Sequence, residues 1–217
     1  MYRGVIAAPP EPSIVIDRPD PVARAAALLS TLEASWFLCG GWAVDAWLGR
    51  QTRAHHDLDI TVFHADQRAV FDHLAGWHLL GHDNNVADDE SEPWDGRVLD
   101  LPAHIHARRD DFDLEVIVNE HENGDWVLNR EPRIALPLSQ SVRATGWGIP
   151  AASPEVLVYY KAYPSVWRDS PRKPPRPHDE LDFAALMPIL SDGQRAWAAE
   201  AISRVNPAHP WLKRLQD

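Results

Sequence analysis

The chain has 217 residues, of which 45% are hydrophobic and 24% charged, and its formal net charge is −11 at pH 7. These values are typical of a globular protein, and the length allows one compact domain or two small lobes that share a cleft. The net charge disfavours duplex nucleic acid as a partner, because affinity for its phosphates depends on lysine and arginine. The single cysteine, Cys39, excludes an intramolecular disulfide, and its apolar neighbours predict a buried side chain.

Neither a signal peptide nor a transmembrane helix is predicted. The apolar part of the first 20 residues is short and is interrupted by Pro9, Pro10 and Pro12. No run approaches the roughly 20 apolar residues that span a bilayer. We therefore expect a cytoplasmic protein without a membrane partner, as a monomer or a homodimer.

The first half of the chain alternates helices and strands. Apolar periodicity and turn residues predict, in chain order, a helix at 20–32, a strand at 36–39, a helix at 42–48, a strand at 57–63, a helix at 65–75 and a strand at 77–80. Gly40-Gly41 forms the expected tight turn before the second helix, and Gly49 is the expected end of that helix. The acidic segment 83–96 is expected to be a solvated loop.

The second half begins with strands and ends with helices. The pattern predicts a strand at 112–119, a hairpin at 125–130 and 134–138, and helices at 153–163, 180–190 and 192–205. A proline-rich basic segment, residues 164–178, lies between the first two of these helices. This order predicts an α/β (α+β) fold with a mixed sheet flanked by helices. Residues 1–150 would be the catalytic domain and residues 151–217 a helical C-terminal region.

Asp57 and Asp59 are the first candidate site residues. They stand two apart in the alternating segment D-L-D-I-T-V-F, so their side chains share one face of a strand. Adjacent carboxylates repel each other unless a cation neutralises them, and Mg²⁺ prefers such oxygen ligands. The alternative is that both are simply the solvent-facing residues of a half-exposed strand.

Asp113 and Glu115 repeat this arrangement in the segment F-D-L-E-V-I-V-N. If the two strands are neighbours in the sheet, three or four carboxylates converge. A two-metal site, with ions about 3.5–4 Å apart, clamps the attacking and leaving oxygens of a displacement reaction. The same solvent-exposed alternative applies to this pair.

The segment G-G-W-A-V-D-A-W-L-G-R-Q-T-R-A-H-H-D-L-D-I, from Gly40 to Ile60, resembles the aminoglycoside and lincosamide nucleotidyltransferases. These belong to the polymerase-β-type nucleotidyltransferase superfamily. The later segment R-P-H-D-E-L-D-F is similar to one found near the C-terminus of aminoglycoside-adenylyltransferase-type members.

The resemblance implies a polymerase-β-type fold, with ATP or another NTP as co-substrate and Mg²⁺ (or Mn²⁺) as cofactor. It assigns metal binding to Asp57 and Asp59 and phosphate contact to Gly40 and Gly41. The third acid of the superfamily maps onto Asp113 or Glu115, and the resemblance does not decide between them. In related resistance enzymes this acid can deprotonate the acceptor hydroxyl.

Three further residues are candidates for nucleotide contact, each with a structural alternative. Arg53 either contacts phosphate or forms a salt bridge to Asp45, and His55 either contacts the nucleotide or makes a structural hydrogen bond. Lys161 lies among apolar helix residues and either reaches solvent or points into the cleft.

Asp179 and Asp182 share one face of a predicted helix. They could pair with Lys161 or Arg176, or bind a cationic acceptor as substrate-binding residues. For Asp182 a solvated helix face is also expected.

His104 and His106 share a strand face, but no further zinc ligand stands at the usual spacing, so no zinc site is predicted.

Together these features predict a two-metal nucleotidyltransferase that moves a nucleoside monophosphate, expected to be AMP, to a hydroxyl of a small molecule such as an aminoglycoside-type antibiotic. One alternative is a toxin-type enzyme that modifies tRNA or protein, with the basic segment 164–178 as the RNA contact. The other is a nucleotide-binding module without catalysis.

Overall fold

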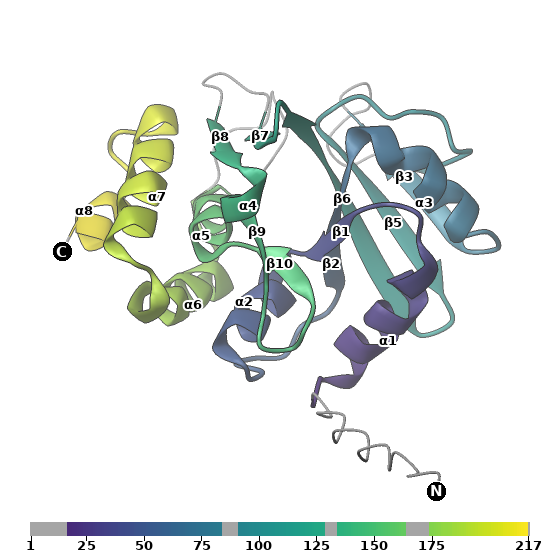
Figure 1. The fold of residues 1–217 in the computed structure, drawn as a ribbon, viewed down its shortest axis with the longest axis horizontal. Coiled ribbons are helices and arrows are strands. Elements are labelled where there is room, and N and C mark those ends of the chain that lie inside the picture. The colour runs from purple at the N-terminus through teal and green to yellow at the C-terminus, as the bar shows by residue number, and fades with distance from the viewer. Residues whose placement is uncertain (1–16, 84–90, 129–133, 164–173, 217) are drawn as a thin grey trace, which may run out of the picture.

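The computed structural model describes residues 17–83, 91–128, 134–163 and 174–216. Within these residues the strands form one mixed sheet in the order β4-β3-β5-β6-β2-β1-β10-β9, and β7 and β8 continue from β6 (Figure 1). The strands are β1 Trp36–Leu38, β2 Leu58–Phe63, β3 His78–His82, β4 Glu92–Pro93, β5 Ala103–Arg109, β6 Phe112–Glu122, β7 Asp125–Leu128, β8 Ile134–Pro137, β9 Val142–Ala144 and β10 Pro150–Ala152.

Helices precede, interrupt and follow the sheet along the chain. The α-helices are α1 Asp20–Leu28, α2 Gly40–Leu48, α3 Gln67–His73, α4 Leu138–Ser141, α5 Pro154–Ala162, α6 Pro177–Leu186, α7 Asp192–Val205 and α8 Trp211–Gln216. Short 3₁₀ turns are η1 Leu29–Thr31, η2 His64–Asp66 and η3 Met187–Ile189. The predicted mixed α/β fold is confirmed. In the described segments, every helix is too short or too polar to span a bilayer.

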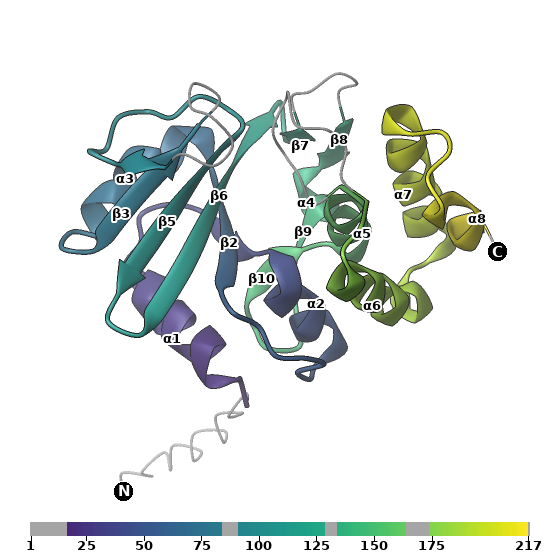
Figure 2. The ribbon, with the colours of Figure 1, turned by 180° about the vertical axis from the view of Figure 1, so that it is seen from behind.

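Strand β6 is buried on one side only. Leu114, Val116 and Val118 are buried, whereas Asp113 and Glu115 are half-buried on the other side. Helices α1 and α3 lie on the buried side, and Figure 2 shows β5 and β6 from the opposite side, where no described helix lies in front of them. The period-two pattern of the sequence therefore places the acidic residues on the open face of the sheet.

Helix α2 connects this sheet to the C-terminal helices. It packs against β2 on one side and against α5 and α6 on the other. It ends as predicted at Gly49, which adopts the left-handed conformation (φ 68°) that a residue without a side chain accepts easily. Because α2 begins beside the open face of the sheet, its first turn lies where the sheet and the C-terminal helices meet.

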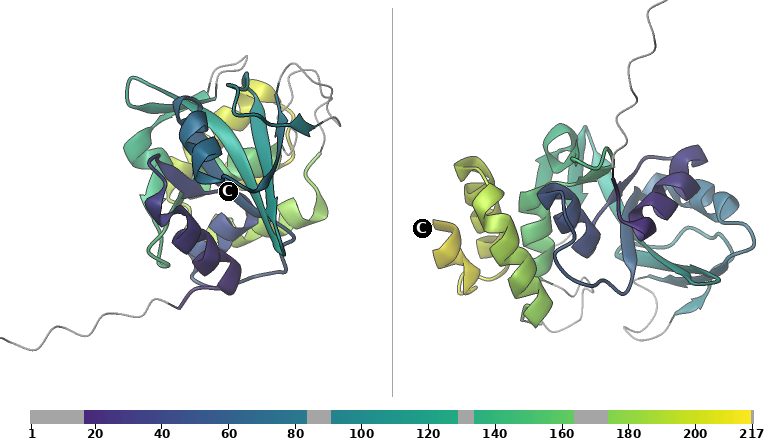
Figure 3. Two further views of the ribbon diagram at one scale, coloured as in Figure 1. Left: turned by 90° about the vertical axis from the view of Figure 1, so that its right-hand side faces the viewer. Right: turned by 90° about the horizontal axis from the view of Figure 1, so that it is seen from below.

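The C-terminal helices form a separate layer at one end of the molecule (Figure 3). Strand β10 crosses the predicted division at residue 150, and α5 then starts with Ser153 at its N-cap. The final helix α8 was not predicted; its Trp211 stacks on Phe183 of α6 with ring centroids 4.1 Å apart. This stacking attaches the end of the chain to α6.

The acidic segment 83–96 differs from its prediction in part. Asp83 is fully buried and accepts a hydrogen bond from Arg97 at 2.6 Å, so a solvated loop is wrong for this residue. Trp94 is also buried, against Phe71. Several charged residues of the segments 83–96 and 164–178 lie outside the described residues, among them Asp88, Asp89, Glu90, Arg168, Arg172 and Lys173.

Candidate active site

The carboxylates predicted from the two alternating segments converge on neighbouring strands. Strands β2 and β6 are parallel and adjacent, and their register places Asp59 directly beside Glu115. Asp57 precedes β2 by one residue, and oxygen atoms of Asp57, Asp59 and Glu115 all lie within 4.8 Å of one another. Asp113, the other candidate on β6, is not in this group and pairs with Arg108 instead. We call Asp57, Asp59 and Glu115 the carboxylate cluster.

The carboxylate cluster is electrostatically unfavourable by itself. Burial raises the pKa of Asp59, and the charges of Glu115 and Asp57 raise it further, to about 8. Burial also raises the pKa of Glu115, but its hydrogen bond with His104 and the charges of His104 and His106 outweigh this effect and lower the pKa. Near neutral pH the cluster must therefore hold a proton on Asp59 or a compensating cation.

The donor set suits a hard divalent cation. Three carboxylates provide only oxygen ligands, as Mg²⁺ prefers, and Asp57 is exposed, so solvent and substrate oxygens can complete the coordination. The convergence of the three carboxylates supports this fit, because a bound cation would offset both the burial and the neighbouring charges that raise the pKa of Asp59.

Gly40 brings the first turn of α2 directly against the carboxylate cluster. It has a positive φ of 61°, and a Cβ at this position would lie 1.8 Å from Oδ2 of Asp59. Any side chain here would displace Asp59. The glycine thus allows the first turn of α2, with its unpaired backbone amides, to lie beside the acids. Amides at the start of a helix bind phosphate groups well.

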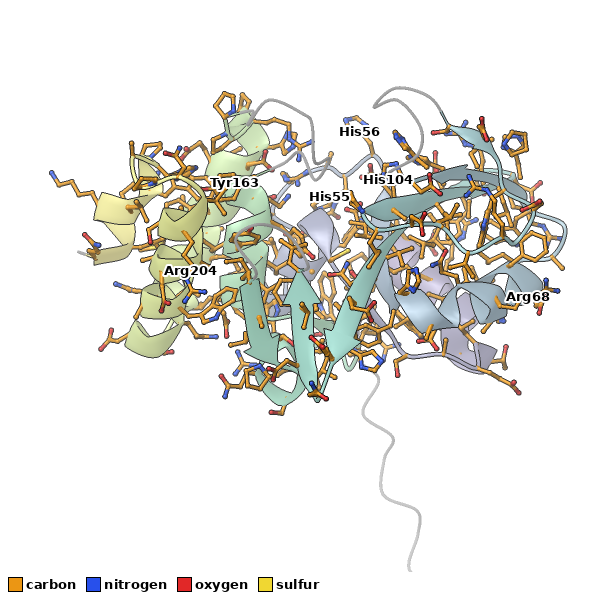
Figure 4. The ribbon with its side chains drawn as sticks, turned by 90° about the horizontal axis from the view of Figure 1, so that it is seen from above. His55, His56, Arg68, His104, Tyr163 and Arg204 are labelled. Atoms are coloured by element: carbon orange, nitrogen blue, oxygen red, sulfur yellow. The ribbon has the colours of Figure 1, made fainter. Side chains whose placement is uncertain are left out.

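Gly41 allows an equally close approach from the loop before β2. A Cβ on Gly41 would lie 2.4 Å from His55 and 2.5 Å from Arg53. His55 also contacts the buried Asp45 at 2.5 Å, which confirms the structural hydrogen bond predicted for it. In Figure 4, His55 and His104 lie between the C-terminal helices on the left and helix α3, which carries the labelled Arg68, on the right.

The salt bridge predicted between Arg53 and Asp45 is wrong. Asp45 is occupied by His55 and by the backbone amide of Thr52. Arg53 instead donates two hydrogen bonds to Asp182 on α6, at 3.0 and 2.9 Å. This pair connects the loop before β2 to the C-terminal helices across 129 positions of sequence.

Asp179 and Asp182 hold three cationic side chains in place. Lys161 of α5 lies 2.7 Å from Asp182 and 3.5 Å from Asp179, and its side chain is only 8% exposed. Arg176 donates to Asp179 through its side chain at 2.8 Å and its backbone amide at 2.9 Å. We call Arg53, Lys161, Arg176 and the two aspartates the α6 ion-pair network.

The α6 ion-pair network corrects one prediction and confirms another. Asp182 is 2% exposed, so a solvated helix face is wrong, whereas pairing of the aspartates with Lys161 and Arg176 is confirmed. Contact with a cationic acceptor stays a prediction, and it would compete with the existing pairs. Gly40 lies against Asp59 and the adjacent Gly41 lies against Arg53, so this network is near the carboxylate cluster.

Comparisons with known proteins agree with this geometry. Residues 22–126, just under half of the chain, match the family described as aminoglycoside-2''-adenylyltransferase. The lincosamide antibiotic adenylyltransferase LnuA in its lincomycin-bound form is similar in structure, with a TM-score of 0.55 and 18% identity over 80% of this chain and 98% of that one. The fold is that of a polymerase-β-type nucleotidyltransferase. The resemblance stated from residues 40–60 is thereby confirmed.

Two structures of the antibiotic-resistance factor ANT(2'')-Ia extend the comparison with this nucleotidyltransferase fold. The solution structure has a TM-score of 0.55 and 15% identity, covering 90% of this chain and 95% of that one. The complex of ANT(2'')-Ia with adenylyl-2''-tobramycin has a TM-score of 0.51 and 18% identity, covering 85% and 96%. A comparison with curated protein sequences gave no match.

The sequence did not predict that His104 and His106 lie beside Glu115. His104 Nδ1 lies 3.0 Å from Glu115 Oε1, across the antiparallel pair β5 and β6. The signal in the sequence was the short connection at 110–111, which makes these strands a hairpin, and Asp110 has the positive φ (54°) of such a turn. With that register, His104 and His106 would have been placed on the face of Glu115.

Proposed function

We propose that this chain transfers a nucleoside monophosphate, AMP from ATP, to a hydroxyl group of a small-molecule acceptor. The convergence of Asp57, Asp59 and Glu115 beside Gly40 carries this proposal. The family match and the two antibiotic adenylyltransferases of similar fold support an antibiotic of the aminoglycoside or lincosamide class as acceptor.

Asp57 and Asp59, with Glu115, would hold two divalent cations, Mg²⁺ or Mn²⁺. When bound, these cations neutralise the triphosphate and the charge that develops on the attacking and leaving oxygens. The protein contributes a fixed pair of strands, so the carboxylates need no reorganisation during the reaction.

The triphosphate would lie between Gly40-Gly41 and the cations of the α6 ion-pair network. Helix α2 begins at Gly40, beside Asp59, so the unpaired backbone amides of its first turn would bind the phosphates there. Arg53, Lys161 and Arg176 would balance the negative charge of the leaving pyrophosphate. In this proposal residues 1–150 supply the carboxylates, and residues 151–217 supply two of the three cations.

Glu115 is the proposed general base. Its lowered pKa keeps it ionised at neutral pH, and only an ionised carboxylate can take a proton. In the reaction, the acceptor oxygen forms a bond to the α-phosphorus, the bond from phosphorus to the pyrophosphate oxygen breaks, and the acceptor proton passes to Glu115. Asp113 is less suited to this role, because its carboxylate pairs with Arg108.

The proposal is tested by incubating the full chain with Mg²⁺ and each of the four common NTPs. Separate reactions contain aminoglycosides, lincosamides, total RNA or no acceptor, and both pyrophosphate release and the mass of the acceptor are measured. We expect a nucleotidylated antibiotic, made from ATP, that is absent with Asp59→Asn. Labelled RNA or self-labelled protein would indicate a toxin-type enzyme instead, and nucleotide binding without turnover would indicate a binding module.

A further inference from the structure

His104, His106 and Glu115 form a second group of donor atoms beside the carboxylate cluster. Strands β5 and β6 are antiparallel, with His106 opposite Glu115 and His104 opposite Ile117. Both imidazoles are therefore on the open face of the sheet with the carboxylate. One donor atom from each of the three side chains lies within 4.8 Å of the other two. The structure thus supplies the third ligand that sequence spacing alone did not reveal.

The chemistry of this group differs from that of the carboxylate cluster. Two imidazole nitrogens and one carboxylate are a zinc-type donor set that leaves a fourth position open, whereas Mg²⁺ prefers oxygen ligands alone. Zn²⁺ binds nitrogen and oxygen at about 2.0–2.2 Å, which brings ligand atoms of one ion to about 3.3 Å from each other. The 3.0 Å between His104 Nδ1 and Glu115 Oε1 is already close to this separation.

The group is accessible, and one of its members is held in orientation. The side chains of His104 and Glu115 are 18% and 20% exposed, so an ion can reach them from solvent. His82, which is buried, packs edge-on against His104, with ring centroids 5.1 Å apart. The rings of His104 and His106 are 4.7 Å apart. These ring contacts restrict the rotation of the His104 imidazole.

We propose that His104, His106 and Glu115 bind one transition-metal ion of the zinc class, in a site that shares Glu115 with the carboxylate cluster. Because Glu115 belongs to both donor sets, an ion held by the histidines draws this carboxylate away from Asp57 and Asp59. Zinc therefore inhibits Mg²⁺-dependent nucleotidyl transfer through this site. The inhibition rests on the proposed function, but the binding itself does not.

Metal binding to the full chain tests the proposal without any activity measurement. Protein stripped with a chelator is titrated with Zn²⁺ against a chromophoric chelator, in the presence of excess Mg²⁺, and Co²⁺ is used to record a visible absorption spectrum. We expect one tight ion per chain. His104→Gln and His106→Gln should each weaken zinc binding by at least about tenfold. His78→Gln, on the exposed part of β3, is the matched control and should bind zinc like the wild type.

Two further variants separate the two donor sets. In titrations without Mg²⁺, Asp57→Asn should leave zinc affinity unchanged, whereas Glu115→Gln should weaken it as strongly as the histidine variants. Zinc binding that depends on Asp57 and not on the histidines would place the ion in the carboxylate cluster and overturn the proposal. Wild-type protein that binds zinc no better than His106→Gln would also overturn it, and His104 would then only position Glu115. Circular dichroism and thermal unfolding verify that each variant is folded.

These results are independent of the proposed enzyme activity. One zinc ion bound through the histidines, in a chain that transfers no nucleotide to any acceptor, would support the site and contradict the proposed function. Nucleotidyl transfer by a chain that binds no zinc would support the proposed function and contradict the zinc site. The two proposals therefore fail separately.

Discussion

Two groups of acids lie near each other in this molecule, and their negative charges are balanced in different ways. In the α6 ion-pair network, Asp179 and Asp182 each contact cationic side chains, and the pKa of both carboxyl groups is lowered despite burial. In the carboxylate cluster, Asp59 has carboxylates as its main neighbours, and its pKa is raised. The first group is complete within the chain. The second requires a cation from outside, which distinguishes it as the candidate metal site.

Asp59→Asn should have the largest effect on activity. Removing a carboxylate from the cluster weakens cation binding, and we expect a loss of about a thousandfold or more in kcat/KM, or roughly 4 kcal/mol. The metal-free protein should not lose stability, because the substitution relieves repulsion among like charges. Steady-state kinetics and urea unfolding measure the two quantities. A variant that is strongly destabilised but active would place Asp59 with the structural acids.

Glu115→Gln and Asp113→Asn compare the two acids of strand β6 directly. Loss of a general base lowers kcat by about 100-fold or more, so Glu115→Gln should be severely impaired. Asp113→Asn removes an exposed pair with Arg108 and should change kcat by less than about threefold and stability by about 0–1 kcal/mol. Equal effects of the two substitutions on kcat would show that neither residue is the base.

Asp182→Asn should chiefly reduce stability. It leaves Lys161 buried without its closest partner and releases Arg53, and breaking a buried ion pair typically costs about 3–5 kcal/mol. We expect the free energy of unfolding, measured with urea, to fall by this amount, and we expect the KM for NTP to rise. Arg204→Gln, which breaks an exposed pair with Glu200 on α7, is the control and should change neither quantity noticeably.

Asp59 should make the metal-free protein less stable as the pH rises from about 4 to about 8, an effect measured as the difference in unfolding free energy between the wild type and Asp59→Asn. The folded chain retains the proton of Asp59 in this range, whereas the unfolded chain has lost it, so each step up in pH favours unfolding. Glu115 acts in the opposite direction only at lower pH, where its depressed pKa is titrated. Added Mg²⁺ should therefore raise the melting temperature more at pH 8 than at pH 5, and this difference should vanish in Asp59→Asn. An equal rise at both pH values would contradict the raised pKa.

Features set by neighbouring residues could be predicted from the sequence. The alternation around Asp59 and Glu115 and the end of α2 at Gly49 each depend on a few adjacent positions. These local patterns predicted that the acids share the open face of the sheet, and they identified the candidate members of the carboxylate cluster. The glycines expected as a turn before this helix instead form its first turn, because α2 begins at Gly40.

Features that depend on distant pairing could not be predicted in this way. The partner of Arg53 is Asp182, 129 positions away, and no periodicity connects the two. The choice between Asp113 and Glu115 depends on how β6 aligns with β2, and both acids have the same local pattern. The contact between His104 and Glu115 likewise required the register of the β5–β6 hairpin.

The central claim is that the carboxylate cluster exists to bind divalent cations, and direct cation binding tests it best. Mn²⁺ can replace Mg²⁺ in such sites, and its electron paramagnetic resonance signal reports the free ion. We predict that the wild type and Asp113→Asn bind Mn²⁺ in the presence of ATP, and that Asp59→Asn does not enhance Mn²⁺ binding above that of ATP alone. Equal Mn²⁺ binding by all three proteins would contradict the account.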